Sequence, residues 1–307
     1  MRDDVSVIVP TYRRPDLLGR LLVALEPAVK NVAGRAAIVV NDGSHDAAYQ
    51  KVVERHAGSV DYVVLEHNVG PAAARNAGAE RVRGGIIVFI DDDCVPPPDW
   101  LDHVSAFFEA FPFAAVVGGY TEPMLPEAPG TVGRFTVAAG MNPNPIVVDG
   151  IPECLPTACL AVRREWFVRI GGFNDQLGYG GEDRDLTHRL TAAAAPVYVD
   201  RSWRVQHDQN WSLRGFCHRA LAFGRSAGRR IALMDRGSAR GSYERHLDIP
   251  TGELIAQLPG TFRRGLSYGT SDEPRIRRWA YGLLAVVWFA TFHLAVKQGR
   301  KSLHHEI

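Results

Sequence analysis

Short apolar runs recur along the first ninety positions of the chain, at residues 5–10, 36–40, 62–65 and 86–90. Runs of this length that are rich in β-branched residues are typical of parallel strands covered on both faces. Between the runs, apolar residues recur at helical spacing, as in the stripe of leucines that follows Pro15. Because parallel strands need crossover connections, this alternation predicts an α/β fold with a mostly parallel sheet flanked by helices.

The pattern is less regular after residue 95. It predicts helices at 99–111, 164–170 and 212–231, and strands at 114–117 and 157–162. The stretch 121–156 is rich in proline and glycine and shows no clear period, so an irregular loop is expected there. Long irregular loops beside a site often contact substrate, which makes this stretch a candidate for substrate recognition.

An uncharged apolar segment lies in the C-terminal part of the chain, at residues 279–296. Arginines precede it, and Lys297, Arg300 and Lys301 follow it. As a helix, it would be at the lower limit for crossing a hydrocarbon core of ~30 Å. The flanking basic residues favour a helix that contacts lipid headgroups. The same apolar segment would also suit a buried helix that packs on the rest of the protein. The sequence leaves both interpretations open.

Composition excludes several classes of protein. With 46% hydrophobic and 22% charged residues among 307, the chain is typical of a globular protein rather than of a disordered one. The 35 basic and 34 acidic side chains give a formal net charge of +1, which does not favour a nucleic-acid partner. The cysteines show no CxxC spacing and are expected to be reduced core thiols of a cytoplasmic protein: Cys94, Cys154, Cys159 and Cys217.

Polar clusters follow three of the predicted strands: Pro10-Thr11-Tyr12, Asn41-Asp42-Gly43 and Asp91-Asp92-Asp93. Ligands of such sheets bind beyond the carboxyl ends of the strands, so the clusters predict a binding site at one edge. Three successive aspartates repel one another unless a cation neutralises them. A hard divalent metal, Mg²⁺ or Mn²⁺, suits carboxylate oxygens, and the position after a buried strand favours it over a solvated acidic turn.

Four further residues are candidates for the same site. Arg75, on an alanine-rich helix, could add a positive charge or be an ordinary surface arginine. Glu182 and Asp183 follow two glycines at a predicted helix start, where they could cap the helix or supply a general base. His207 would be a hydrogen-bonded structural residue unless the chain folds it back toward Asp93.

Glycine-rich phosphate loops are missing from the sequence. Neither GxGxxG nor GxxxxGK[ST] occurs, which argues against a dinucleotide oxidoreductase and against a P-loop ATPase. The sequence also lacks GxSxG and HExxH. Groups other than a glycine-rich cradle must therefore hold an anionic ligand.

Six motifs, in this order, resemble those of the family 2 glycosyltransferases: VSVIVPTYRR, VVNDGSHD, HNVGPAAARNAG, FIDDDC, AVRREWFVRIGGFNDQL and GGEDRDL. The resemblance covers about residues 4–210. It implies a GT-A fold, in which helices flank a Rossmann-like, mostly parallel sheet. It also implies a metal-dependent enzyme that transfers a single sugar, with inversion, from a nucleotide-diphosphate donor to an acceptor hydroxyl. A UDP-sugar is favoured as the donor, with dTDP- and GDP-sugars as alternatives.

The resemblance suggests how the chain is divided. Residues 1–95 are expected to bind the nucleotide-sugar, and residues 96–211 to form the acceptor-binding and catalytic half of the same GT-A domain. Residues 212–307 are expected to form a helical C-terminal extension. The acceptor would be a glycan, a lipid-linked molecule or a small molecule. We expect the protein in the cytoplasm, either in solution or held at the inner face of the membrane through 279–296.

The resemblance also implies a role for each candidate residue. Donor contacts are implied for Pro10, Thr11 and Tyr12 along the nucleobase, Asp42 at the base, Arg75 near the nucleotide, and either Asp91 or Asp92 near the ribose. The divalent metal, Mn²⁺ or Mg²⁺, is implied to bind Asp93 and, as in some members, His207. Asp183 corresponds to the catalytic base, and Glu182 to the residue that helps to hold the acceptor.

Two features depart from the family pattern. Cys94 stands where many relatives carry a fourth acidic residue, and the QxxRW motif of processive synthases is absent, which favours addition of one sugar. Two other functions remain as alternatives. A nucleotidyltransferase would show a glycine-rich basic loop where this chain has TYRRPD. A binding protein without catalysis would not need both Asp93 and Asp183, since each is costly to bury without a role.

Overall fold

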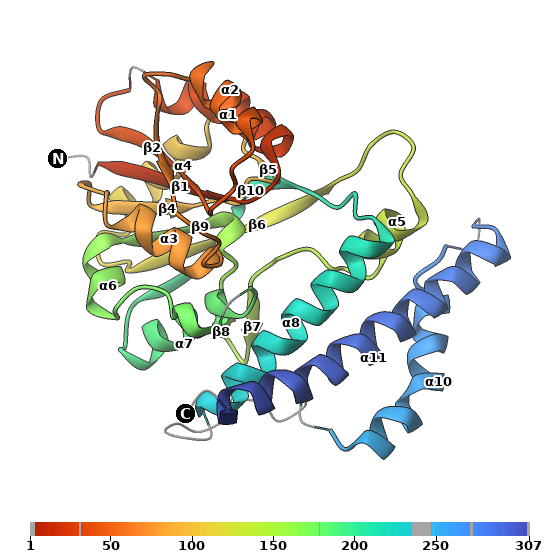
Figure 1. The fold of residues 1–307 in the computed structure, drawn as a ribbon. Coiled ribbons are helices and arrows are strands. Elements are labelled where there is room, and N and C mark those ends of the chain that lie inside the picture. Colours follow the sequence, from red (N-terminus) through yellow and green to blue (C-terminus); the bar gives the residue numbers. More distant parts are fainter. Residues whose placement is uncertain are drawn as a thin grey trace. The chain divides into compact units, whose positions relative to one another are not determined.

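The computed structural model describes residues 4–30, 32–177, 179–234, 247, 249–270 and 273–305. These residues form two compact units (Figure 1). The first contains the described residues of Met1–Glu122, Pro143–Gly178 and Glu182–His207, and the second those of Pro123–Asn142, Tyr179–Gly181 and Asp208–Ile307. Both predicted halves of the GT-A domain contribute to the first unit, and their assignment to donor and acceptor stays a prediction.

Four parallel strands form the N-terminal part of the sheet: β1 (Val5–Thr11), β2 (Arg35–Asn41), β3 (Val60–Val64) and β4 (Ile86–Phe89). They lie in the order β3-β2-β1-β4, so β1 is paired on both sides, and all seven of its residues are buried. The predicted parallel strands are confirmed in this part of the fold. Because these strands run in the same direction, their carboxyl ends share one edge of the sheet.

The other strands make the sheet a mixed one. β9 (Leu160–Arg163) runs antiparallel to both β4 and β6 (Val116–Met124). β10 (Val197–Asp208) runs antiparallel to β5 (Cys94–Val95), and the described strands follow the order β3-β2-β1-β4-β9-β6-β10-β5. Because β5 directly follows the aspartates at the end of β4, its pairing with β10 brings the end of β10 to the predicted site.

Helices cover both faces of this sheet (Figure 1). One face carries α1 (Pro15–Val29), α2 (Ala47–Glu54) and α4 (Trp100–Ala110); the other carries α3 (Pro71–Ala79), α6 (Arg164–Arg169) and α7 (Glu182–Ala192). Alternation along β1 divides the core between the faces, since Val7 and Val9 pack with the leucines of α1 whereas Ile8 packs with α3. The helices predicted after each parallel strand are therefore confirmed.

The prediction of an irregular loop at 121–156 is wrong. This stretch contains the end of β6, the helix α5 (Thr131–Ala138), and a hairpin of β7 (Ile146–Val148) and β8 (Ile151–Cys154). Its glycines and prolines stand largely between elements: Gly130 precedes α5, while Asp149 and Gly150 adopt positive φ in the hairpin turn. Elements of three to nine residues are too short to show a period, which explains the error.

The second unit is built mainly from helices. Its long helices are α8 (Leu213–Met234), α10 (Thr251–Ser267) and α11 (Arg275–His305). α8 and α11 lie side by side (Figure 1), and they approach closely at Gly228 and Gly299, where an added Cβ would meet the backbone of the facing helix. Among the described helices, α11 alone is long and apolar enough to cross a membrane. Of its most apolar stretch of 18 residues, 39% is buried.

Candidate active site

The aspartates that follow β4 lie at the shared edge of the parallel strands. Asp92 is fully buried and Asp93 is 4% exposed, so neither is part of a solvated turn. The hydroxyl of Thr11, the last residue of β1, donates a hydrogen bond of 2.7 Å to Oδ2 of Asp92. The structure thus joins two of the three predicted clusters through a buried hydrogen bond. Burial raises the pKa of Asp92, although the guanidinium of Arg14 and the hydroxyl of Thr11 act in the opposite direction.

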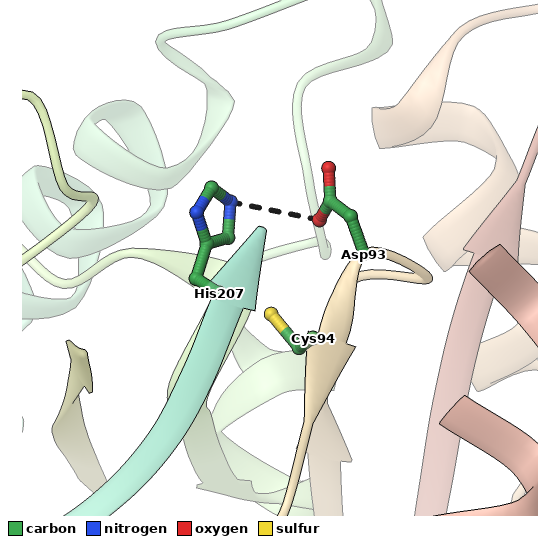
Figure 2. A group of neighbouring side chains, drawn as sticks. All are labelled: Asp93, Cys94 and His207. Atoms are coloured by element: carbon green, nitrogen blue, oxygen red, sulfur yellow. Dashed lines mark ion pairs between the residues drawn. The ribbon is translucent and has the colours of Figure 1, made fainter. Parts of the chain in front are cut away.

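His207 does fold back toward Asp93 (Figure 2). The antiparallel register of β10 and β5 places His207 opposite Cys94, and its Nε2 lies 3.5 Å from Oδ1 of Asp93. Two adjacent ligands of one Mg²⁺ or Mn²⁺ ion lie about 3 Å apart, so a small rearrangement would let both atoms bind the same cation. The aspartate oxygen and the imidazole nitrogen therefore fit a divalent metal, with the remaining positions left to water or substrate.

Cys94 also lies close to these two ligands. Single potential ligand atoms of Asp93, Cys94 and His207 all fall within 4.8 Å of one another. Burial raises the pKa of the Cys94 thiol well above its ordinary value, and the neighbouring Asp93 carboxylate adds to the effect. A protonated thiol is a poor ligand, and Mg²⁺ and Mn²⁺ prefer oxygen and nitrogen, so the pair of Asp93 and His207 is the better candidate.

Arg75 joins the two acidic clusters of the site. Its guanidinium donates to Oδ1 of Asp91 at 2.6 Å and to Oε1 of Glu182 at 2.8 Å. Its side chain is only 4% exposed, so it is not an ordinary surface arginine. The parallel strands and α3 bring Arg75 to Asp91, and the packing of α7 on the same face brings Glu182 to Arg75. This buried link is the first direct sign that the two clusters form one site.

Glu182 and Asp183 open α7, directly after Gly180 and Gly181, which both adopt positive φ. The backbone N–H of Arg184 donates to Oδ1 of Asp183 at 2.8 Å. Burial raises the pKa of both acidic residues, while Arg75 opposes the rise for each. Oε2 of Glu182 is buried and has no hydrogen-bond partner among the described residues. A bound ligand that donates a proton there would satisfy this oxygen.

The remaining predicted donor residues lie on the first two strands and just beyond them. Pro10 is buried within β1, and Tyr12 is half-buried beneath the guanidinium of Arg13. The Asp42 carboxylate accepts hydrogen bonds from Asn68 and from the backbone N–H groups of residues 69 and 70. In the structure, Asp42 therefore fastens the loop that leads into α3, a role that the sequence did not predict.

Arg14 is a charged residue of the site that sequence reasoning missed. Its guanidinium contacts Oδ1 of Asp92 at 2.5 Å and Oδ2 of Asp93 at 2.7 Å. The motif TYRR contains this residue, but its spacing carries no sign that the side chain turns toward aspartates some eighty positions later. The only available signal was charge, since three successive aspartates call for nearby positive groups.

Comparison with known proteins extends these observations beyond the site itself. A chain described as "Pre-mycofactocin glycosyltransferase" from Mycobacterium tuberculosis is 28% identical over 230 residues, which are 73% of this chain and 47% of that relative. Glycosyltransferase AglE of Haloferax volcanii is 27% identical over 192 residues, 62% of each chain. The present chain thus spans about half the length of the first of these relatives.

Solved structures show the same fold. "Mannosyltransferase PcManGT from Pyrobaculum calidifontis in complex with GDP-Man and Mn2+" superposes with a TM-score of 0.61 at 18% identity, over 98% of this chain and 87% of that one. TarS of S. aureus, residues 1–349, gives a TM-score of 0.55 at 17% identity, over 99% and 92%. At these identities the likeness supports the GT-A fold and not a substrate.

Two family models match the chain. One, described as N-terminal domain of galactosyltransferase, matches residues 152–201, which include the Glu182–Asp183 pair. The other, described as Glycosyl transferase family 2, matches residues 6–170, more than half of the 307 residues. That match includes the three strand ends, the aspartates after β4 and Arg75. On this evidence, the chain belongs to glycosyl transferase family 2.

Proposed function

We propose that the protein is a metal-dependent, inverting glycosyltransferase that moves one sugar from a nucleoside-diphosphate donor to an acceptor hydroxyl. A UDP-sugar is the first donor to test. One observation carries the proposal: Arg75 links the aspartates after β4 to the acidic pair of α7 within one buried network. A cation-binding carboxylate and a candidate base thereby belong to a single site, as transfer between two bound substrates requires.

The donor end of the reaction lies at the carboxyl edge of the sheet. Asp93 and His207 would hold Mn²⁺ or Mg²⁺, which supplies a Lewis acid for the negative charge that develops on the leaving diphosphate. Of the two candidates for the ribose contact, Asp91 is the more exposed and would make it, while Pro10, Thr11 and Tyr12 would lie along the base. Asp42 would act there by shaping the loop before α3, because its carboxylate already accepts three hydrogen bonds.

At the acceptor end, Asp183 would act as the general base. Its Oδ1 accepts the N–H of Arg184, and its other oxygen would take the proton of the acceptor hydroxyl. As the proton leaves, the acceptor oxygen bonds to the anomeric carbon from the face opposite the departing diphosphate, so the configuration inverts. The raised pKa of Asp183 makes it a stronger base than an ordinary aspartate. Glu182 would hold the acceptor through its buried Oε2.

Binding of nucleoside diphosphates tests the donor site directly. We expect calorimetry with UDP, dTDP and GDP to show tight binding of one of them, at least about tenfold weaker without Mn²⁺. Asp93→Ala should abolish the Mn²⁺ dependence, because it removes the carboxylate that would hold the cation. Unchanged metal-dependent affinity in this variant would exclude Asp93 as a ligand, and no binding by the folded protein would favour a non-catalytic function.

The product separates the two enzymatic alternatives. A glycosyltransferase releases a nucleoside diphosphate as it consumes the sugar nucleotide, whereas a nucleotidyltransferase releases diphosphate from a nucleoside triphosphate. Incubation with the nucleotide-sugar that binds and an acceptor, and separately with a nucleoside triphosphate and a sugar phosphate, followed by ³¹P NMR, distinguishes these products. The anomeric proton coupling of the glycoside reports whether the configuration has inverted.

The exposed face of α11 supports contact with a lipid surface, which we include in the proposal. Its buried residues face α8 and α10, while a stripe of apolar side chains remains exposed: Ile276, Trp279, Leu283, Val287 and Leu294. α11 contains no acidic residue, and basic residues stand at both ends of the stripe. An apolar stripe between basic ends suits a helix that lies in the headgroup region of an anionic membrane, on the cytoplasmic side if the protein is intracellular.

Vesicle binding tests this surface. The double variant Leu283→Glu, Leu294→Glu should bind vesicles rich in phosphatidylserine at least about tenfold less than the parent, because two apolar contacts become charged. Sedimentation with vesicles measures the loss. A matched control is Val23→Glu, which alters an apolar residue of α1 that is 67% exposed and should leave binding unchanged. Equal binding of the parent and the double variant would exclude this stripe as the lipid contact.

A further inference from the structure

Arg14 bridges the two aspartates that are buried most deeply at the candidate metal site. One guanidinium nitrogen contacts Asp92 and another contacts Asp93. The side chains of these aspartates are 0% and 5% exposed, whereas that of Arg14 is 34% exposed. The acidic groups are therefore fixed within the protein, and the arginine is the partner with room to move.

The backbone before Arg14 is held firmly in place. The N–H of Arg14 donates to the buried hydroxyl of Tyr49 at 2.7 Å, and that of Arg13 donates to Oγ of Ser44 at 2.8 Å. Arg13 has a φ of 54°, in the left-handed region that costs free energy for a residue other than glycine. This turn directs the next side chain, Arg14, over the aspartates.

Each carboxylate oxygen of Asp93 faces a different side chain. Its Oδ1 faces His207, the other candidate metal ligand, and its Oδ2 accepts the hydrogen bond of Arg14. A divalent cation on Oδ1 would lie within a few ångströms of the guanidinium, and two positive charges at that distance repel each other. The diphosphate of a donor would offset this repulsion, because it brings negative charge that both cations can bind.

We propose that Arg14 is a built-in counter-ion that competes with the divalent cation for Asp93 and turns to the diphosphate when donor and cation bind together. Arg14 thereby makes binding of the cation and of the nucleotide mutually dependent. The inference rests on the proposed donor site. It adds that, because of Arg14, the cation alone binds weakly, whereas the cation together with its nucleotide binds tightly.

The test measures Mn²⁺ alone and UDP separately. Without nucleotide, Arg14→Gln should bind Mn²⁺ about tenfold more tightly than the parent, because the competing charge is gone. With saturating Mn²⁺, the same variant should bind UDP about tenfold more weakly, because one phosphate contact is lost. Electron paramagnetic resonance of free Mn²⁺ gives the first affinity, and calorimetry gives the second.

Two further variants make the result specific. Arg13→Gln removes the neighbouring charge, whose guanidinium lies over the ring of Tyr12, and should leave the Mn²⁺ affinity unchanged. Arg14→Lys keeps the charge but lacks the two-pronged guanidinium, so its Mn²⁺ affinity should fall between those of the parent and Arg14→Gln. If Arg14→Gln does not fold, the Mn²⁺ affinity of Arg14→Lys serves as the test.

Unchanged or weaker Mn²⁺ binding in the Arg14 variants would overturn the inference. The proposed function fails by a different result, namely that the parent protein binds no nucleoside diphosphate with Mn²⁺. The two failures are thus distinguishable. The Mn²⁺ measurement also holds whichever nucleotide the protein prefers.

Discussion

Replacing Asp183 by asparagine should reduce turnover by about 10²–10⁴-fold, the contribution of a general base, and leave nucleotide affinity within about twofold. Asparagine has nearly the same shape, and its Oδ1 can still accept the N–H of Arg184. It cannot take the proton of an acceptor hydroxyl. The measurements are kcat at saturating donor and acceptor, and the nucleotide Kd in the presence of Mn²⁺.

The pH dependence of the parent enzyme gives a second view of the same group. Burial raises the pKa of Asp183 above the ordinary aspartate value of about 3.9. Because the base must be ionised to act, kcat/KM should fall as the pH is lowered through this raised pKa. The residual activity of Asp183→Asn should lose the part of the acidic limb that Asp183 contributes and keep the part from Glu182 and Asp92, whose pKa values are raised to about 7.

A control on the same helix shows whether the effect is local. Asp185→Asn alters a carboxylate that pairs with Arg189 on α7 and should change kcat by less than about twofold. If Asp183→Asn instead lost nucleotide binding while keeping turnover at high donor concentration, Asp183 would be a donor-binding residue and not the base.

Arg75→Met should lower the free energy of unfolding by about 3–5 kcal/mol, because it leaves a buried ionic network without its cation. Asp91 and Glu182 would then face each other across the position of the lost guanidinium. Urea unfolding at pH 7.5 measures the loss. Nucleotide binding should weaken in the same variant, since the donor and acceptor ends of the site would no longer be joined.

The loss of unfolding free energy in Arg75→Met, relative to the parent, should become smaller as the pH falls. Burial raises the pKa of Glu182 even with Arg75 present, and removing the cation raises it further. At a pH above the parent's Glu182 pKa of about 7, the folded variant therefore binds more protons than the folded parent, so the difference in stability shrinks as the pH falls toward 7 and changes little below it.

The matched control is Arg81→Met, which removes an arginine whose side chain is half exposed and lies 3.8 Å from Asp61. A surface pair of this kind contributes little, so the expected change is below about 0.5 kcal/mol. Equal losses in the two variants would show that Arg75 is not the centre of a buried network.

The parallel half of the sheet could be predicted from sequence because its signals are local. A run such as 86–90 is apolar throughout and must be buried on both faces, whichever strands adjoin it. The leucines of α1 likewise follow the period of a helix, and four of them are buried. The stretch 121–156 was misjudged since α5 and the β7–β8 hairpin are short, so neither repeats its pattern often enough to be recognised.

For the candidate site, too, some features could be predicted from the sequence and others could not. Sequence alone determined which residues stand at the ends of the parallel strands, and the order of its motifs indicated the family. Tertiary structure decided which of them meet. Arg75 and Glu182 are 107 positions apart, and only the packing of α3 and α7 on one face brings them together. His207 reaches Asp93 through the antiparallel pairing of β10 with β5, and Arg14 reaches it through a strained turn. A local pattern cannot encode these contacts, because they depend on how distant elements pack.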